Sequence, residues 1–91
     1  MDNHQLFYAM INKVPRIARL WDQDTNDLKL EDFERQLGVM SSGEVQLAKF
    51  FAAVWFNDNT RYGFDVVDAV STLNPHSRKI VIDWLIKPFY P

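Results

Sequence analysis

The chain has 91 residues, 47% of them hydrophobic and 14% aromatic, and a formal net charge of −2. This length accommodates one domain, residues 1–91, and the apolar content excludes a disordered chain. The absence of cysteine excludes disulfides, thiol nucleophiles and cysteine-ligated zinc. The small negative charge disfavours nucleic-acid binding, which would need a large basic excess.

The first ten residues, MDNHQLFYAM, lack the basic region and the apolar core of a secretory signal. No apolar run approaches the roughly 20 residues that a membrane-spanning helix requires. We therefore expect a soluble cytoplasmic protein that makes no membrane contact.

Apolar residues recur at intervals of three and four from Leu6 to Trp21, which predicts a helix with one apolar side. Pro15 interrupts this pattern, because its ring clashes with the carbonyl of Ile11 at a cost of about 3 kcal/mol. Two alternatives stay open: a helix kinked at Pro15, or a split with a second short helix over Arg16–Trp21. The basic residues of the polar side are Lys13, Arg16 and Arg19.

The stretch WDQDTNDLKLEDF begins like a calcium-binding loop, with Asp22, Asp24 and Asn26 at alternate positions. Such a loop needs glycine at position 6 and a bidentate acid at position 12. Counted from Asp22, these positions hold Asp27 and Phe33. The ligands that close the loop are absent, so we expect no metal and interpret the acids as helix caps.

The next helix is predicted from Asp27 to Leu37, with Leu30, Phe33 and Leu37 buried. Gly38 should end it in a left-handed conformation.

Ser41 and Glu44 match the S-x-x-E capping box, in which each side chain accepts a bond from the other residue's backbone N–H. The helix that follows, about 42–56, has only Gln46 and Lys49 as polar interior positions. A helix that is apolar nearly all round is enclosed by others, so we expect this one at the centre of the fold.

Two further helices complete the prediction. The first, Asp65–Leu73, should bury its valines and Leu73. The second begins at Asn74–Pro75, a cap followed by proline, and runs to Lys87. The expected fold is all-α: one compact domain of four to five short helices around the apolar helix 42–56.

No constellation for catalysis is present. His4 and His76 have no cysteine near them, no G-x-S-x-G or comparable element presents a nucleophile, and the three glycines form no phosphate-binding loop. We expect a non-enzymatic protein without catalytic residues or cofactor.

Helices 65–87 resemble a DNA-binding helix-turn-helix in length. Ser77, Arg78 and Lys79 would lead the recognition helix, but apolar residues then cover most of its circumference. We interpret that helix as buried on too many sides for this role.

The aromatic residues exceed what a small core encloses. Phe51 and Trp55 are expected in the core. For Tyr8, Trp21, Phe89 and Tyr90, a core position and a contact surface both stay open. With the acidic segment, these aromatic residues define the predicted interaction site, made of Trp21, Asp22, Asp24, Asp27, Phe89 and Tyr90.

Residues 42–70, SGEVQLAKFFAAVWFNDNTRYGFDVVDAV, combine a Ser-Gly start with Ala48, Phe50–Phe51, Trp55, Asn57 and Phe64–Asp65. This pattern resembles small uncharacterised helical proteins of bacterial plasmids, integrative elements and phages. The resemblance implies a mobile-element accessory protein and no particular activity.

These observations predict a module that binds and modulates another protein, with a basic partner surface complementing the acidic segment. A homodimer is a further alternative. The rival from a different class is a small DNA-binding accessory regulator that uses helices 65–87.

Overall fold

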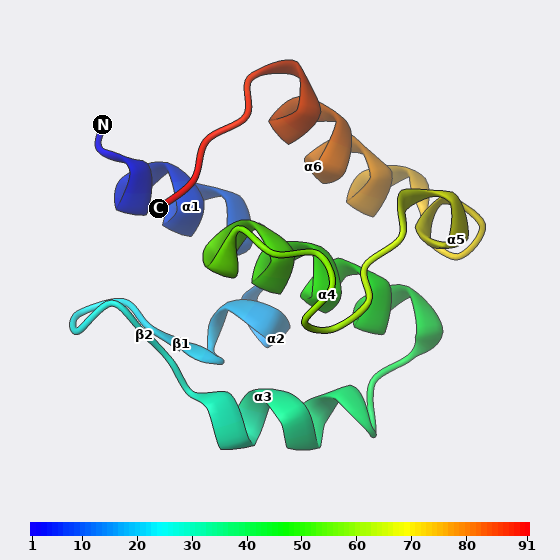
Figure 1. The fold of residues 1–91 in the computed structure, drawn as a ribbon, viewed down its shortest axis with the longest axis horizontal. Helices are drawn as coiled ribbons and strands as arrows, with labels where there is room; N and C mark the ends of the chain where they lie inside the picture. Colours follow the sequence, from blue (N-terminus) through cyan, green and yellow to red (C-terminus); the bar gives the residue numbers. More distant parts are fainter.

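Six α-helices and one two-stranded antiparallel ladder make up the computed structural model, which describes residues 1–91 (Figure 1). The elements are α1 (Asn3–Ile11), α2 (Pro15–Ala18), β1 (Trp21–Asp22), β2 (Asp27–Leu28), α3 (Leu30–Leu37), α4 (Ser42–Phe56), α5 (Val66–Val70) and α6 (Pro75–Ile86). The fold is thus mostly helical, and the ladder was not predicted. No helix combines the length and the apolar character that crossing a bilayer requires.

The chain breaks at Pro15, which decides between the two alternatives for the first segment. Pro15 is the first residue of α2, where its missing N–H costs no hydrogen bond. The Val14 backbone N–H donates to the Ile11 carbonyl at 2.8 Å and turns the chain between the two helices. The second helix is therefore shorter than the predicted Arg16–Trp21.

A hairpin follows, with Trp21 opposite Leu28 and Asp22 opposite Asp27. The prediction that Asp27 begins a helix was wrong, because local bonds reverse the chain first. The Asp22 carboxylate accepts from the backbone N–H groups of Asp24 and Thr25 at 3.1 and 3.2 Å. Asn26 adopts the left-handed conformation, with φ of 60°, that such a tight turn needs.

Helix α3 begins at Leu30 and buries Phe33 completely. Leu30 is 38% exposed, contrary to its predicted burial. Gly38 ends the helix as predicted but with φ of −76°, so the expected left-handed conformation was wrong. Its N–H donates to the Arg35 carbonyl at 3.2 Å and closes the last turn without a backbone reversal.

Helix α4 supplies more buried residues than any other helix. They are Leu47, Ala48, Phe50, Phe51, Ala52 and Val54. Figure 1 shows α4 between α1 and α6 on one side and α2 and α3 on the other. The predicted capping box is confirmed, since Ser41 Oγ accepts from the Glu44 N–H at 3.3 Å and Glu44 Oε1 accepts from the Ser41 N–H at 3.1 Å.

Aromatic rings fill the space between α1, the hairpin and α4. The Phe7 ring lies 5.4 Å from Trp21, 6.4 Å from Phe51 and 5.1 Å from Trp55, measured between centroids. Trp21 in turn meets Phe33 edge-on at 5.8 Å, which links α3 to the same cluster. We call Phe7, Trp21, Phe33, Phe51 and Trp55 the aromatic cluster.

Helices α5 and α6 are held much less firmly. The Asp65 side chain caps α5, and Asn74 with Pro75 starts α6 as predicted. However, α5 ends at Val70, and only Ala69 of that helix is buried. The predicted burial of its valines was therefore wrong, while Leu73 after the helix is buried. Helix α6 buries only Ile80 and Val81.

We expect Ser41→Ala to lower the free energy of unfolding by about 1 kcal/mol, the usual cost of losing an N-cap. The double variant with Glu44→Ala should lose less than the sum of the single losses, because both side chains belong to one cap. Chemical denaturation of the three variants measures this. Strictly additive losses would contradict a reciprocal cap.

Candidate interaction surface

Helices α5 and α6 present aliphatic side chains to solvent on neighbouring surfaces. We call this set the α5–α6 face; its members, each 46–77% exposed, are Val66, Val67, Val70, Ile82, Leu85 and Ile86. Ile82 and Ile86 are four residues apart and therefore share one side of α6. That side points away from buried Ile80 and Val81. The face is thus apolar surface that the domain's own core does not use.

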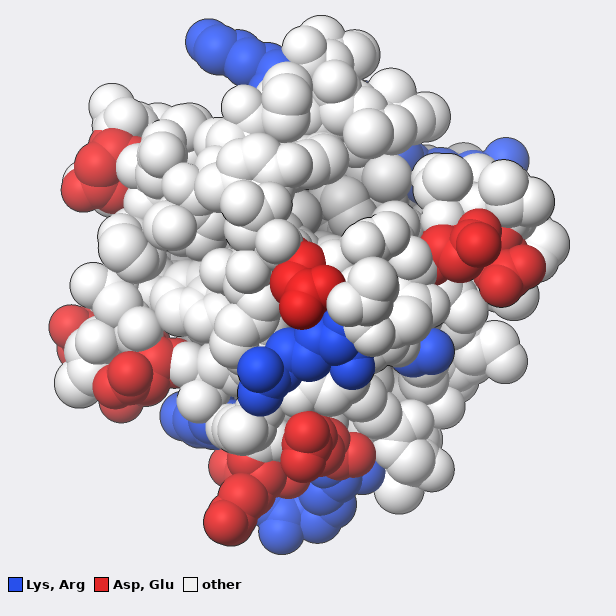
Figure 2. Space-filling model, in the orientation of Figure 1, with Lys and Arg blue, Asp and Glu red and all other residues white.

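A cavity of about 390 Å³ opens beside this face, between α6, the end of α4 and the loop that follows α4. Its apolar wall consists of Phe50, Ala53, Val54, Phe64, Val66, Val81, Trp84, Leu85 and Tyr90. The Phe50 ring lies 5.5 Å from both Phe64 and Trp84 and holds the wall together. Figure 2 shows the surface over α6 and the adjoining part of α4 as a largely uncharged area with charged groups at its edges. A volume of this size can receive several side chains of a partner.

The polar edge of the cavity comes from Asn57, Asp58 and Asn59, and Asp58 is the one charged residue in the lining. Its Oδ1 accepts from the Thr60 hydroxyl at 2.6 Å and from the Thr60 N–H at 2.9 Å. The hydroxyl bond, more than the N–H bond, holds the pKa of Asp58 below its usual value. The cavity therefore carries a stable negative charge at neutral pH.

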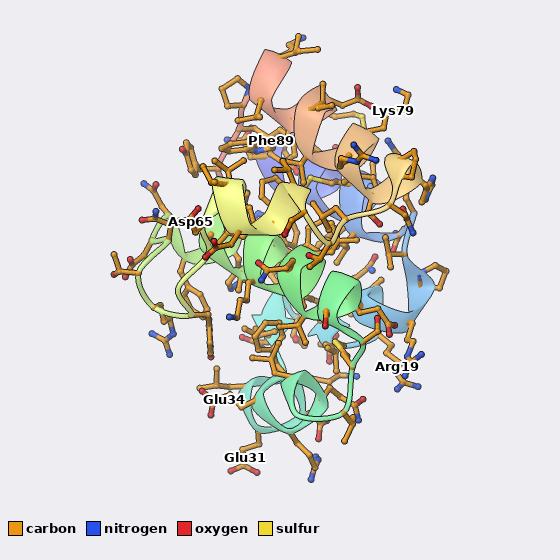
Figure 3. All side chains as sticks on the ribbon, turned by 90° about the vertical axis from the view of Figure 1, so that its right-hand side faces the viewer. Arg19, Glu31, Glu34, Asp65, Lys79 and Phe89 are labelled. Atoms are coloured by element: carbon orange, nitrogen blue, oxygen red, sulfur yellow. The ribbon has the colours of Figure 1, made fainter.

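Further charges lie on the two sides of α5. Figure 3 shows Asp65 on one side of this helix and Lys79 on the other. The Lys79 ammonium is already paired with Asp83 of its own helix at 2.9 Å. Arg61 stays outside the cavity lining and stacks its guanidinium over the Phe56 ring at 4.2 Å. The one charged group in the cavity lining is thus acidic.

Trp21, for which a core position and a contact surface were both open, lies in the core and not on a contact surface. It is only 3% exposed and lies in the aromatic cluster. Successive residues of a strand point to opposite sides. Pairing with β2 therefore turns Trp21 into the core and Asp22 outward.

Asp22, Asp24 and Asp27 lie on the hairpin, which Figure 1 places at the other end of the molecule from α5. The Asp22 carboxylate is engaged in its own turn, and the Thr25 N–H lowers the pKa of Asp22. Asp24 and Asp27 are exposed. No group of three or more His, Cys, Asp or Glu side chains converges as a metal would require.

Phe89 and Tyr90 belong to a segment that folds back after α6. The Trp84 Nε1–H donates to the Phe89 carbonyl at 2.9 Å, and Asn3 Nδ2 donates to the Tyr90 carbonyl at 2.9 Å. Phe89 packs half-buried against the core, whereas Tyr90 is 45% exposed. Of the predicted interaction site, only Tyr90 lines the cavity. The structure therefore separates the acids from the aromatic residues that were expected to act with them.

The aliphatic residues of the α5–α6 face were missed because their periodicity was taken as evidence of burial. A usable signal was present in KIVIDWLI, whose apolar residues occupy more of the helix circumference than one buried side needs. Comparison of the chain with protein-family models, with curated proteins and with solved structures finds no match. The geometry of the surface is therefore the basis for a functional proposal.

We expect Trp21→Ala to lower the free energy of unfolding by about 3–5 kcal/mol, the cost of truncating a buried aromatic side chain. Asp24→Lys, on the exposed turn of the same hairpin, should change it by no more than about 0.5 kcal/mol. Urea denaturation of both variants tests the assignment. A small loss of unfolding free energy for Trp21→Ala would contradict the burial of this residue.

We expect Thr60→Val to raise the pKa of Asp58 toward its ordinary value, because the variant removes the hydroxyl donor. The folded-state pKa of Asp58 is depressed, so its stabilising contribution is present above the unfolded value of about 3.9. That contribution is lost as the pH falls through the folded-state pKa, and the variant should lose less stability over this acid range. Carboxyl-carbon NMR titration and acid denaturation measure the two effects; an unchanged pKa would contradict the role of Thr60.

Proposed function

We propose that this protein is a non-enzymatic interaction module whose α5–α6 face docks onto a helix of another protein, and that this helix is apolar on one side and basic beside it. The observation that carries the proposal is the set of exposed aliphatic residues on two consecutive helices, of which Val66 and Leu85 line the cavity. Clusters of exposed large apolar residues mark interaction sites in soluble proteins.

The valines of α5 support a role in binding, because they contribute little to the stability of the domain. β-Branched residues lower helix propensity, and this helix has only five residues. Val67 is 74% exposed and Val70 51%, so neither gains much of the burial energy that would offset this cost. Contact with a partner would supply that burial.

The cavity and its edge indicate the chemistry of the partner. A standard interface covers about 800 Å² of each protein, roughly 15% of the 5422 Å² surface of this molecule. A partner helix lying on the face can insert apolar side chains into the cavity, as in helix-in-groove recognition. Asp58, with Asp65 and Asp68 of α5 nearby in sequence, favours lysine or arginine on that helix.

The resemblance of residues 42–70 to mobile-element proteins fits this location. Three positions that carry the resemblance, Phe50, Asn57 and Phe64, also line the cavity. In this proposal the protein is a mobile-element accessory that modulates a partner by occupying one of the partner's helices.

DNA binding by helices 65–87 is the rival function. The outward side of α6 is open, so the expectation of burial on too many sides does not hold. That side carries Ile82, Leu85 and Ile86 beside Arg78 and Lys79, and the Lys79 ammonium is paired with Asp83, so few polar groups are left to read bases and phosphates. DNA binding in a gel shift that weakens steeply as the salt concentration is raised would favour the rival function over our proposal. A dimer mass in light scattering would instead make a second copy the occupant of the face.

We expect the double variant Val67→Ser/Leu85→Ser to weaken partner binding about 10-fold or more, since it removes apolar contacts from both helices of the face. Each substitution should change the free energy of unfolding by no more than about 0.5 kcal/mol. Val39→Ser is the matched control, because Val39 is 66% exposed and lies between α3 and α4. Pull-downs with the wild type and these variants decide the matter. Proteins captured equally by all of them would contradict docking at this face.

The charge of the partner is tested with two amphipathic helical peptides, one of leucine and lysine and one of leucine and glutamate. We expect the lysine peptide to bind more tightly and the difference to shrink with added salt. Asp58→Asn should also reduce the difference, because Asp58 is the charged residue of the cavity lining. Equal binding of the two peptides would remove the basic partner from the proposal.

A further inference from the structure

The segment Pro88–Pro91 lies across the molecule from the end of α6 to α1 (Figure 1). None of its residues takes part in a backbone–backbone hydrogen bond. Two side chains hold it: Trp84 donates to the Phe89 carbonyl, and Asn3 donates to the Tyr90 carbonyl. We call this segment the strap.

The strap covers apolar surface on both sides of Trp84. Phe89 lines a small cavity of about 150 Å³ whose apolar wall also includes Leu6, Met10 and Ile80. Tyr90 lines the larger cavity beside the α5–α6 face. Trp84 lines both cavities, and its ring meets Phe89 at 6.5 Å and Tyr90 at 5.6 Å, both edge-on. The strap therefore lines two apolar cavities, one on each side of Trp84, and we call the apolar surface beneath it the groove.

We propose that the strap is an internal ligand of this groove, which an extended partner segment with adjacent aromatic side chains displaces. The proposal rests on the proposed function, because the groove continues into the cavity of the α5–α6 face through Tyr90. The strap itself shows what the groove accepts: two neighbouring rings and a carbonyl that takes the Trp84 Nε1–H bond.

Proline keeps the strap in an extended form. Pro88 cannot continue α6, and the residue before it, Lys87, has φ of −140° and ψ of 75° and so leaves the helical region. The bond from Asn3 to the Tyr90 carbonyl is exposed to water. The strap has no backbone–backbone hydrogen bond, and segments held by so few bonds open locally without unfolding of the domain.

Because the strap is attached to the domain, it competes with any partner at an effective concentration on the order of millimolar. A free peptide with the sequence of the strap should therefore bind poorly to the wild type. It should bind well once the strap's own rings are removed.

The test uses the full chain with Phe89→Ser/Tyr90→Ser and the capped peptide Lys-Pro-Phe-Tyr-Pro. We expect the peptide to bind this variant at least about 10-fold more tightly than the wild type, as competition at high effective concentration requires. The Trp84 indole N–H signal in NMR should shift when the rings are removed and return when the peptide is added. The same peptide with serine in place of both rings is the control and should not bind.

A milder variant separates displacement from damage to the core. Asn3→Ala removes only the bond to the Tyr90 carbonyl and should raise peptide binding a few-fold, by the same competition. Asn12→Ala removes comparable exposed bonds, one donated by Asn12 to Gln23 and one donated by Gln23 to Asn12, and should leave peptide binding unchanged.

Two outcomes would overturn the proposal: a folded double variant that does not bind the peptide, and a double variant that no longer melts cooperatively. The second would show that Phe89 is core that cannot leave. Neither outcome bears on the Val67→Ser/Leu85→Ser comparison, which tests docking on the α5–α6 face separately. Conversely, the peptide could bind while the double variant Val67→Ser/Leu85→Ser captures partners as well as the wild type. That result would contradict docking on the α5–α6 face but would still support the groove as a peptide-binding site.

Discussion

The aromatic cluster, through which α4 packs against α1, the hairpin and α3, is the contact on which the other elements depend. Phe51 and Trp55 of α4 meet Phe7 of α1, and Trp21 joins Phe33 of α3 to the same group. Nineteen residues are buried in all, and α5 and α6 together contribute three of them, Ala69, Ile80 and Val81. The core is therefore concentrated on one side of the molecule. The apolar residues of the α5–α6 face remain exposed because the domain offers nothing on the other side to cover them.

Local signals in the sequence were sufficient where local bonds decide the structure. The Ser41–Glu44 cap and the Asn74–Pro75 start each depend on atoms within three residues. Pro15 marked a break, but the choice between a kink and a split depends on how α1 and α2 pack. The hairpin was missed because two strands of two residues have no periodicity to detect. Its turn is made by the Asp22 carboxylate and by the left-handed Asn26.

The candidate site was harder to predict than the fold, because periodicity shows which residues share a side and not whether anything covers that side. The valines of α5 and the isoleucines of α6 satisfy the same spacing as buried residues. For Trp21 the sequence left a core position and a contact surface open, and strand pairing turned this side chain into the core. Distinguishing the two cases requires knowing how much core the remaining helices already supply.

The strap and the α5–α6 face differ in how closely binding is coupled to folding. Residues of the face are about half exposed or more, so truncating them lowers the stability of the domain little. In the proposed function it lowers the affinity for the partner strongly. Phe89 packs against the core, and Trp84 bonds to the Phe89 carbonyl while lining both cavities. A partner that displaces the strap must therefore replace contacts that stabilise the domain itself. Since Tyr90 lines the cavity next to the face, such a partner would gain apolar contact on the face as it replaces those of the strap.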